Sequence, residues 1–300
     1  MSFLSASRFD RLCLLELIMT GARDTVLRIT QREVAQKSGI AQSRVSLFEN
    51  MASEVRFSGL HQRKQRGGTI LEDLTSVLQD GLQFTQSEVA LGLRLAEEEI
   101  LPFNKKDESD LLALMRKVSV DRPSTLQMKV GVDPHARERA WLDLESADGN
   151  LLVLSALPLE GDEQRMDQIR GNASRFGARF IHCRGCVEGT TTGNRTPSLG
   201  NWLTFLGYSG KCQIGLLDST PSLELEMKLS SGVILSGQKT HFAHNEKESL
   251  PFLSHLEWHD RSSVLWAACV FETTWLSVPE KDRSRERVLP WLRKHIDRAP

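Results

Sequence analysis

Two groups of side chains in this sequence have types and spacings that could do chemistry. The first group lies between residues 31 and 46 and combines glutamine, arginine and serine. Glutamine can pair with adenine, and arginine with guanine, through two hydrogen bonds each, so these residues could read base edges in DNA. The second group is the C-x-x-C pair Cys183 and Cys186. Its thiols could supply half of a zinc site, form a redox pair or simply be buried structural side chains.

The first group must be positioned by two short helices. Thr30 is a good N-cap, and Glu33 three residues later completes a capping box, so a helix is expected to begin at Gln31. Gly39 is expected at the turn, because a left-handed conformation costs glycine least. A second helix is expected to begin near Ala41.

Small and apolar residues in the same stretch predict how the two helices cross. Val34 and Ala35 are expected to face inward, and Ala35 must be small if the second helix passes close above it. Val45 and Phe48 follow at a spacing of three and are expected inside as well. Two short helices with a tight glycine turn predict a helix-turn-helix, whose second helix enters the major groove. The candidate DNA-contacting residues of the stretch are Gln31, Arg32, Gln42, Ser43, Arg44 and Ser46.

The stretch resembles the Cro/CI-like, or XRE-type, helix-turn-helix regulators. The residues that carry the resemblance are Thr30-Gln31, Val34-Ala35, Ser38-Gly39-Ile40, Gln42-Ser43, Val45-Ser46 and Phe48-Glu49-Asn50. The resemblance implies that Gln31 and Gln42 cooperate at an operator, that residues 42–46 read bases, and that two copies bind an inverted repeat. It covers about 25 residues strongly and does not extend to residues 119–300.

A basic segment follows the helix pair. Arg63, Lys64 and Arg66 precede Gly67 and Gly68 and could contact phosphate as a flexible arm. Alternatively, residues 55–60 and 69–75 would be the strands of a wing and this segment its tip, which makes the N-terminal domain a winged helix. A solvated loop is the third interpretation.

Charge and composition narrow the class of protein. Residues 1–68 hold eleven Lys and Arg against six Asp and Glu, a balance of +5, whereas residues 69–118 hold five against ten, a balance of −5. A basic first segment favours a nucleic-acid partner. No apolar run is long enough for a membrane span, and the start of the chain lacks the features of a signal peptide. The odd number of cysteines, five, favours a reducing cytoplasmic location.

The order of helix-like and strand-like segments along the chain predicts two domains and an α+β fold class. Residues 1–118 are expected to form an all-helical helix-turn-helix domain, or a winged one in the alternative given above. Ser119 to Thr125 are expected to form a polar break. Residues 124–300 are expected to form a mixed, largely antiparallel α/β domain, with a helix at 160–178 and a basic helix near the end. Strands are expected within 125–132, 140–146, 150–159, 178–185, 212–218, 223–237 and 263–278, and residues 147–150 form the turn of a hairpin.

These observations predict a sequence-specific DNA-binding transcription regulator, a dimeric repressor whose C-terminal domain dimerises or senses a small molecule or protein. No catalytic motif, cofactor motif or complete metal site is recognised, so an enzyme is not expected. A DNA-targeted, nuclease-like enzyme is one alternative, although its candidate acids Asp143, Glu145 and Asp218 follow no known motif. A phage or plasmid replication or partition protein is the other.

Overall fold

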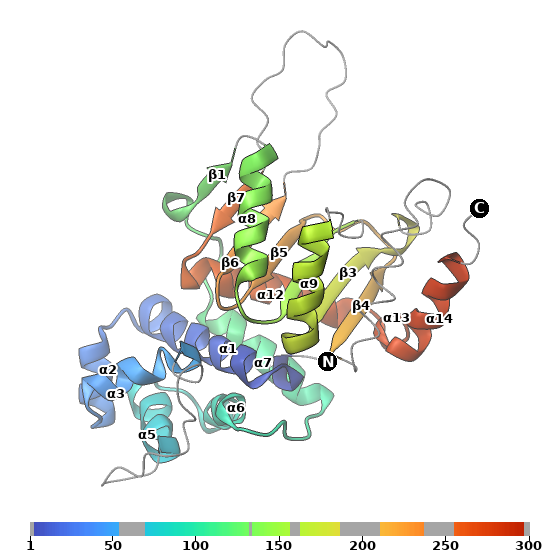
Figure 1. Ribbon diagram of the computed structural model, residues 1–300. Helices are drawn as coiled ribbons and strands as arrows, with labels where there is room; N and C mark the ends of the chain where they lie inside the picture. Colours follow the sequence, from blue (N-terminus) through green and yellow to red (C-terminus); the bar gives the residue numbers. More distant parts are fainter. Residues whose placement is uncertain are drawn as a thin grey trace. The chain divides into compact units, whose positions relative to one another are not determined.

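The structure is a computed structural model that describes residues 3–53, 70–131, 134–156, 163–186, 211–236 and 255–296 (Figure 1). The chain divides into two compact units. Unit 1 comprises Met1–Pro123 and Arg261–Cys269, and unit 2 comprises Ser124–Asp260 and Val270–Pro300. The segment Arg261–Cys269 therefore joins the first unit although it comes late in the sequence.

The described part of unit 1 is helical, as the sequence predicted for most of residues 1–118. Two of its helices, α1 and α5, run on into π-helical segments. The elements are η1 (Phe3–Ser5), α1 (Arg8–Gly21), η2 (Ala22–Leu27), α2 (Gln31–Ser38), α3 (Gln42–Phe48), α5 (Ile70–Ser76), η4 (Val77–Gly81), α6 (Gln86–Ala96) and α7 (Lys105–Val118).

Helix α1 is the centre of the unit 1 core. Leu12, Leu14, Leu15 and Ile18 are fully buried on it, and this near-continuous burial explains why the helix has almost no polar face. Arg11 is also buried, and its guanidinium donates hydrogen bonds to the carbonyl oxygens of Arg94 and Glu98. These bonds join α1 to the end of α6.

Unit 2 is built on a mixed seven-stranded sheet with the order β1-β7-β6-β5-β2-β3-β4. The strands are β1 (Lys129–Gly131), β2 (Leu151–Leu154), β3 (Ala178–Cys183), β4 (Cys212–Leu217), β5 (Leu225–Lys228), β6 (Gly232–Ser236) and β7 (His255–Trp258). Strands β2, β3 and β4 are parallel, with Leu151 opposite Ala178, and the other four pairings are antiparallel. The prediction of helices mostly at the N-terminus and a mixed, largely antiparallel sheet after them is confirmed for the described residues.

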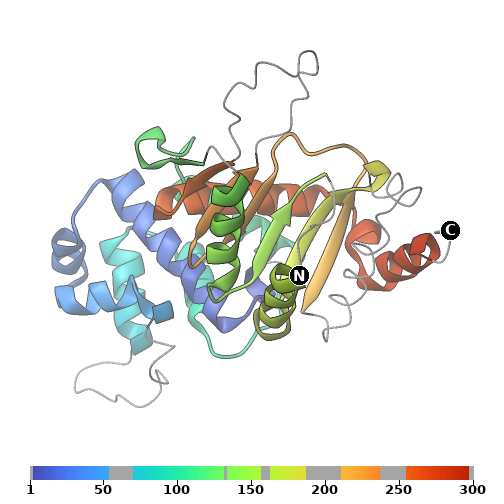
Figure 2. The ribbon, with the colours of Figure 1, turned by 45° about the horizontal axis from the view of Figure 1, so that its top comes forward.

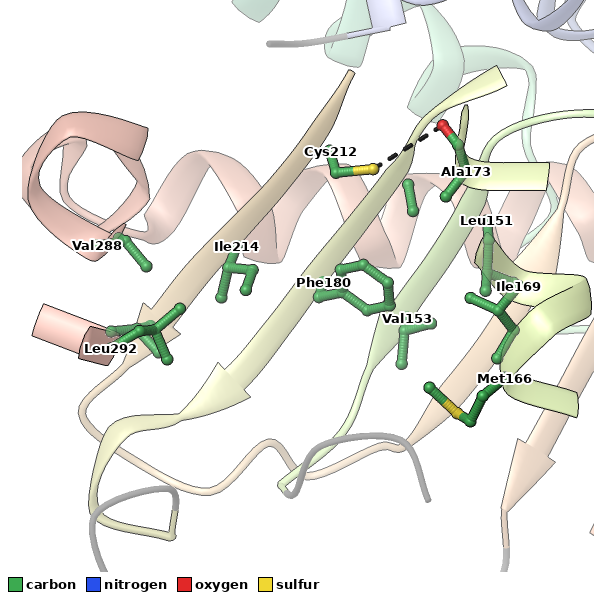
Figure 3. Close-up of a cluster of buried hydrophobic side chains, with 12 residues drawn as sticks. Leu151, Val153, Met166, Ile169, Ala173, Phe180, Cys212, Ile214, Val288 and Leu292 are labelled. Atoms are coloured by element: carbon green, nitrogen blue, oxygen red, sulfur yellow. Dashed lines mark hydrogen bonds between the residues drawn. The ribbon is translucent and has the colours of Figure 1, made fainter. Parts of the chain in front are cut away.

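Helix α9 (Glu163–Phe176) is the crossover between the parallel strands β2 and β3, and it ends at Gly177, where φ is +93°. Alternate residues of β2, β3 and β4 bury against it, as the period of two requires. Helix α14 (Arg285–Ile296) adds to the same cluster, and Pro290 lies inside this helix and does not end it. The core residues labelled in Figure 3 are Leu151, Val153, Met166, Ile169, Ala173, Phe180, Cys212, Ile214, Val288 and Leu292.

Helices cover both faces of the sheet in unit 2. Helices α8 (Pro134–Ser146) and α9 lie on one face, and the unit 2 part of α12 (Arg261–Ser277) lies on the other (Figures 1 and 2). Arg179 of β3 pairs with Glu272 of α12 at 2.8 Å, and both side chains are buried. Two shorter elements complete the unit, η5 (Thr125–Gln127) and α13 (Glu280–Arg283). Among the described residues, no helix is both long enough and apolar enough to cross a membrane.

Three predictions for residues 124–300 are wrong. Residues 140–146 belong to helix α8, because Ala140 and Leu144 are four apart and pack together on Ile234. Residues 263–277 belong to α12, which is buried on most sides and so lacks the polar face that marks a surface helix. Residues 147–150 consequently join a helix to a strand and do not form a hairpin turn. Strand β7 at 255–258 was not predicted.

Candidate functional site

Two short helices, α2 and α3, carry most of the residues that the sequence singled out. The hydroxyl of Thr30 accepts a hydrogen bond from the backbone N–H of Glu33, whose carboxylate accepts one from the N–H of Thr30 at 2.7 Å. This is the expected capping box. Gly39 has φ of +70°, and its N–H bonds to the carbonyl oxygen of Ala35. The chain therefore turns sharply between the two helices.

The facing sides of α2 and α3 are packed as the pattern predicted. Val34 and Val45 are completely buried, as is Phe48, and Ala35 is nearly so. Val34 also meets η4, because a Cβ added to Gly81 would lie 2.8 Å from its Cγ1. The pair is thus held as one body by side chains at the predicted positions.

The candidate DNA-contacting residues differ in their exposure. Arg32, Gln42 and Ser43 are exposed, whereas Gln31, Arg44 and Ser46 are half-buried. Gln42 and Ser43 are the first two residues of α3, so their side chains lie at its N-terminal end, just before the buried Val45.

Arg44 is held by a neighbouring helix. Its Nε and Nη2 lie 2.8 and 2.6 Å from Oδ2 of Asp73 on α5, and its guanidinium lies 5.9 Å from the ring centre of Phe48. Both charged side chains are less than a fifth exposed. Asp73 could not be predicted as the partner of Arg44, since nothing in the sequence around Arg44 indicates a residue 29 positions away.

Gln31 is likewise bonded within unit 1. Its Nε2 donates a 2.7 Å hydrogen bond to Oε2 of Glu49, which is buried and also forms an ion pair with Arg23 at 3.0 Å. Asn50, next along the chain, accepts a hydrogen bond from Arg261. The start of α2 and the end of α3 are therefore joined by a polar network.

The basic segment lies beyond what the structure covers. Arg63, Lys64 and Arg66 fall outside the described residues, as does the first strand of the wing alternative. The second strand of the wing alternative, residues 69–75, is contradicted, because Ile70–Ser76 is the helix α5.

Cys183 and Cys186 lie at the carboxyl end of β3 in unit 2. Cys183 is buried and ends the strand, Cys186 is half-buried, and residues 184–186 are helical. The hydroxyl of Thr220 lies 3.9 Å from each sulfur. All five cysteines are thiols. Over the described ranges, no three His, Cys, Asp or Glu residues are grouped so that they could hold a metal ion.

The candidate acids of the nuclease-like alternative have separate environments. Asp143 is exposed on α8. Glu145 on the same helix is buried, and its Oε1 accepts a 2.8 Å hydrogen bond from Nε of Arg165. Asp218 follows β4, is largely exposed and pairs with Arg184 at 3.4 Å. No metal-binding grouping includes them in the described part of the chain.

Comparison of the chain with models of protein families, with curated proteins and with solved structures gives no match.

Proposed function

We propose that this protein is a sequence-specific DNA-binding transcription regulator that uses α2 and α3 as a helix-turn-helix. One observation carries the proposal: a capped helix turns at a left-handed Gly39 into a second helix that begins with the exposed Gln42 and Ser43. In this motif the beginning of the second helix reads base edges in the major groove. Such a regulator would act in the cytoplasm.

Exposure and bonding give the six candidate residues different proposed roles. Gln42 and Ser43 are the proposed base-reading residues, since both are exposed at the start of α3. Arg32 is exposed on α2 and is the proposed phosphate contact. Gln31 and Arg44 are bonded to Glu49 and Asp73, and we propose that they hold the two helices in place. Ser46 is half-buried on α3 and flanks the reading end.

Glutamine at the reading end predicts an adenine contact. The side-chain amide of Gln42 offers one donor and one acceptor, which match the N7 and N6 edge of adenine. Each such bidentate pair contributes about 1–3 kcal/mol of discrimination against other bases. We further propose that two copies act as a repressor on an inverted repeat, with half-site centres one helical turn, or about 34–36 Å, apart. Unit 2 would then serve dimerisation or respond to a small molecule or a protein.

The experiment selects binding sites for the full chain from a random duplex pool and measures affinity for the best site by fluorescence anisotropy. We expect Gln42→Ala to weaken specific binding by about 1–3 kcal/mol and to relax the preference at one base pair. Arg32→Ala should weaken specific and nonspecific binding alike and lower the salt slope by about one. Gln36→Ala is the matched control, because Gln36 is exposed on α2 away from the reading end.

The binding test does not use a variant of Arg44. Its loss would remove the ion pair with Asp73, so weaker DNA binding could come from a less stable fold and not from a lost DNA contact. Failure to enrich any sequence, or unchanged specificity in the Gln42→Ala, Ser43→Ala double variant, would contradict the proposal. Sedimentation with and without the selected duplex separately tests whether two copies bind.

A further inference from the structure

The C-x-x-C pair stands at an edge of the sheet where side chains from several segments meet. Strands β2, β3 and β4 are parallel, so their carboxyl ends point to the same edge. Ligands of open α/β sheets bind at this edge. Cys183 ends β3 here, and its backbone N–H donates to the carbonyl oxygen of Ala156 beyond β2. Thr220, beyond β4, reaches the same place.

Contacts between the two cysteines hold their sulfurs together. The backbone N–H and the thiol of Cys186 both hydrogen-bond to the sulfur of Cys183, and the N–H of Gly185 adds to them. The hydroxyl of Thr220 donates to the sulfur of Cys183 at 3.9 Å and lies at the same distance from the sulfur of Cys186. A Cβ built on Gly185, between the two cysteines, would meet no described atom within 4 Å.

The acidity of the two thiols follows from these contacts. Burial raises the pKa of the Cys183 thiol, but the hydrogen bonds from Cys186, Thr220 and Gly185 outweigh burial and leave its pKa below the ordinary value. Burial and the hydrogen bond to Cys183 raise the pKa of Cys186. The pair is therefore asymmetric, with one sulfur favoured as thiolate and the other as its proton donor. The thiolate is the nucleophilic form of cysteine.

We propose that Cys183 and Cys186 form a redox-active dithiol that exchanges with small-molecule disulfides, with Cys183 as the attacking sulfur and Cys186 as the resolving one. The buried Cys212 provides the contrast within the same unit, since burial raises the pKa of its thiol to about 11. Its sulfur donates a hydrogen bond to the carbonyl oxygen of Ala173 in the core (Figure 3).

The exchange proceeds in two balanced steps. The Cys183 thiolate attacks one sulfur of the disulfide R–S–S–R, a Cys183–S–S–R bond forms, and RS⁻ leaves and takes a proton from water. Cys186 gives its proton to water, and its thiolate attacks the sulfur of Cys183 and releases the second RS⁻. The dithiol loses two electrons and two protons, and R–S–S–R becomes two RSH. This site is independent of the proposed DNA-binding function, because all of its residues belong to unit 2.

The test uses the full, reduced chain and oxidised glutathione near neutral pH, followed by intact mass and peptide mapping. We expect the mass to fall by two hydrogen atoms and the map to show a Cys183–Cys186 link. Cys186→Ser should instead retain one glutathione on Cys183, because the resolving sulfur is gone. Cys212→Ser is the matched control and should form the Cys183–Cys186 disulfide at the same rate as the unaltered protein.

Alkylation of the unaltered protein with iodoacetamide at several pH values provides a measurement that needs no variant. Cys183 should be alkylated at least about tenfold faster than Cys212 near neutral pH. Cys212 is completely buried, and each unit by which its pKa is raised lowers its thiolate fraction tenfold when the thiol predominates. Thr220→Val should shift the pH midpoint of that labelling upward. Stable glutathione adducts on the unaltered protein without ring closure would overturn the proposal. The proposal would also be overturned if glutathione reacted with Cys186 in the Cys183→Ser variant but did not react with the Cys186→Ser variant. Equal rates of alkylation of Cys183 and Cys212 would overturn it as well.

Discussion

The side-chain amide of Gln31 donates a 2.7 Å hydrogen bond to Glu49, which joins the first residue of α2 to the C-cap of α3. Glu49 is only 1% exposed, and its other carboxylate oxygen lies 3.0 Å from Nε of Arg23. A buried carboxylate without such partners is costly, because it has lost its hydration. The packing of α2 against α3 is consequently linked to the polar partners of the buried Glu49 carboxyl group.

Removing the amide should therefore loosen the helix pair. We expect Gln31→Ala to lower the free energy of opening of α2 and α3 by about 1–3 kcal/mol, since Glu49 loses a hydrogen bond to its charge. Hydrogen exchange of the peptides that cover residues 29–50 measures this. Gln42→Ala makes the same chemical change at an exposed position and should alter the opening free energy by less than about 0.5 kcal/mol. Equal effects of the two substitutions would show that the bond to Glu49 contributes nothing.

Gly39 allows a graded test of the turn. Its φ is +70°, but a Cβ placed there would meet nothing within 4 Å, so the cost of a side chain is conformational and not steric crowding by neighbours. We expect Gly39→Asn to be tolerated best, Gly39→Ala to cost about 1 kcal/mol and Gly39→Val to cost more. The readout is again hydrogen exchange in α2 and α3. If alanine and valine were as stable as glycine, the left-handed turn would be wrong.

Glu16 makes the stability of unit 1 depend on pH. Burial raises its pKa from 4.5 to about 7, although its carboxylate accepts a hydrogen bond from the N–H of Ala52 and lies near Arg261. Below pH 4.5 the carboxyl is protonated in both the folded and the unfolded chain. Between pH 4.5 and about 7 the unfolded chain loses this proton first, so stability falls by up to about 3 kcal/mol as the pH rises, and it then stays lower.

Glu16→Gln should remove that slope. The amide oxygen still accepts from Ala52, and no charge is desolvated, so we expect the variant to match the unaltered protein near pH 4.5 and to exceed it by about 1–3 kcal/mol at pH 8. Urea unfolding followed by helical circular dichroism at several pH values gives the difference. Other groups titrate equally in both proteins and cancel in the comparison. Parallel curves for the two proteins would exclude Glu16 as the cause.

Local chemistry explains which parts of the fold could be predicted from the sequence. The capping box at Thr30 and the left-handed Gly39 involve residues at most five apart, and so α2, the turn and α3 were predicted closely. The short apolar runs of β3 and β4, which are mostly buried, were visible for the same reason. Helix α12 was missed because it is buried on most sides, and β7 because its four residues mix two apolar with two polar side chains.

Partners distant in sequence explain what could not be predicted of the sites. The bonds of Gln31 to Glu49 and of Arg44 to Asp73 span 18 and 29 residues. They depend on how the helices pack, for which the sequence offers no periodic signal. Thr220 follows β4, whereas Cys183 ends β3. The two residues meet because the parallel strands end at the same edge of the sheet.

A buried charge network in unit 2 gives the last prediction. Arg165 on α9 bonds to Glu145 on α8 at 2.8 Å and to Glu226 on β5 at 3.1 Å, and its guanidinium lies 4.0 Å from the ring centre of Trp141. Burial raises the pKa of both carboxyl groups, and the charge of Arg165 opposes this effect.

Arg165→Met should therefore remove the cation that bonds to both buried carboxyl groups and destabilise unit 2 by about 3–5 kcal/mol. The loss should be greater at pH 8 than at pH 5. Without Arg165 the pKa of each buried carboxyl group rises further, so the folded chain holds these protons over a wider pH range while the unfolded carboxyl groups are ionised. Arg170→Met is the control on the same helix. Arg170 pairs with the exposed Asp167, so its loss should cost less than about 1 kcal/mol. Urea unfolding followed by tryptophan fluorescence measures both, and similar midpoints for the two variants would show that the network around Arg165 does not stabilise the fold.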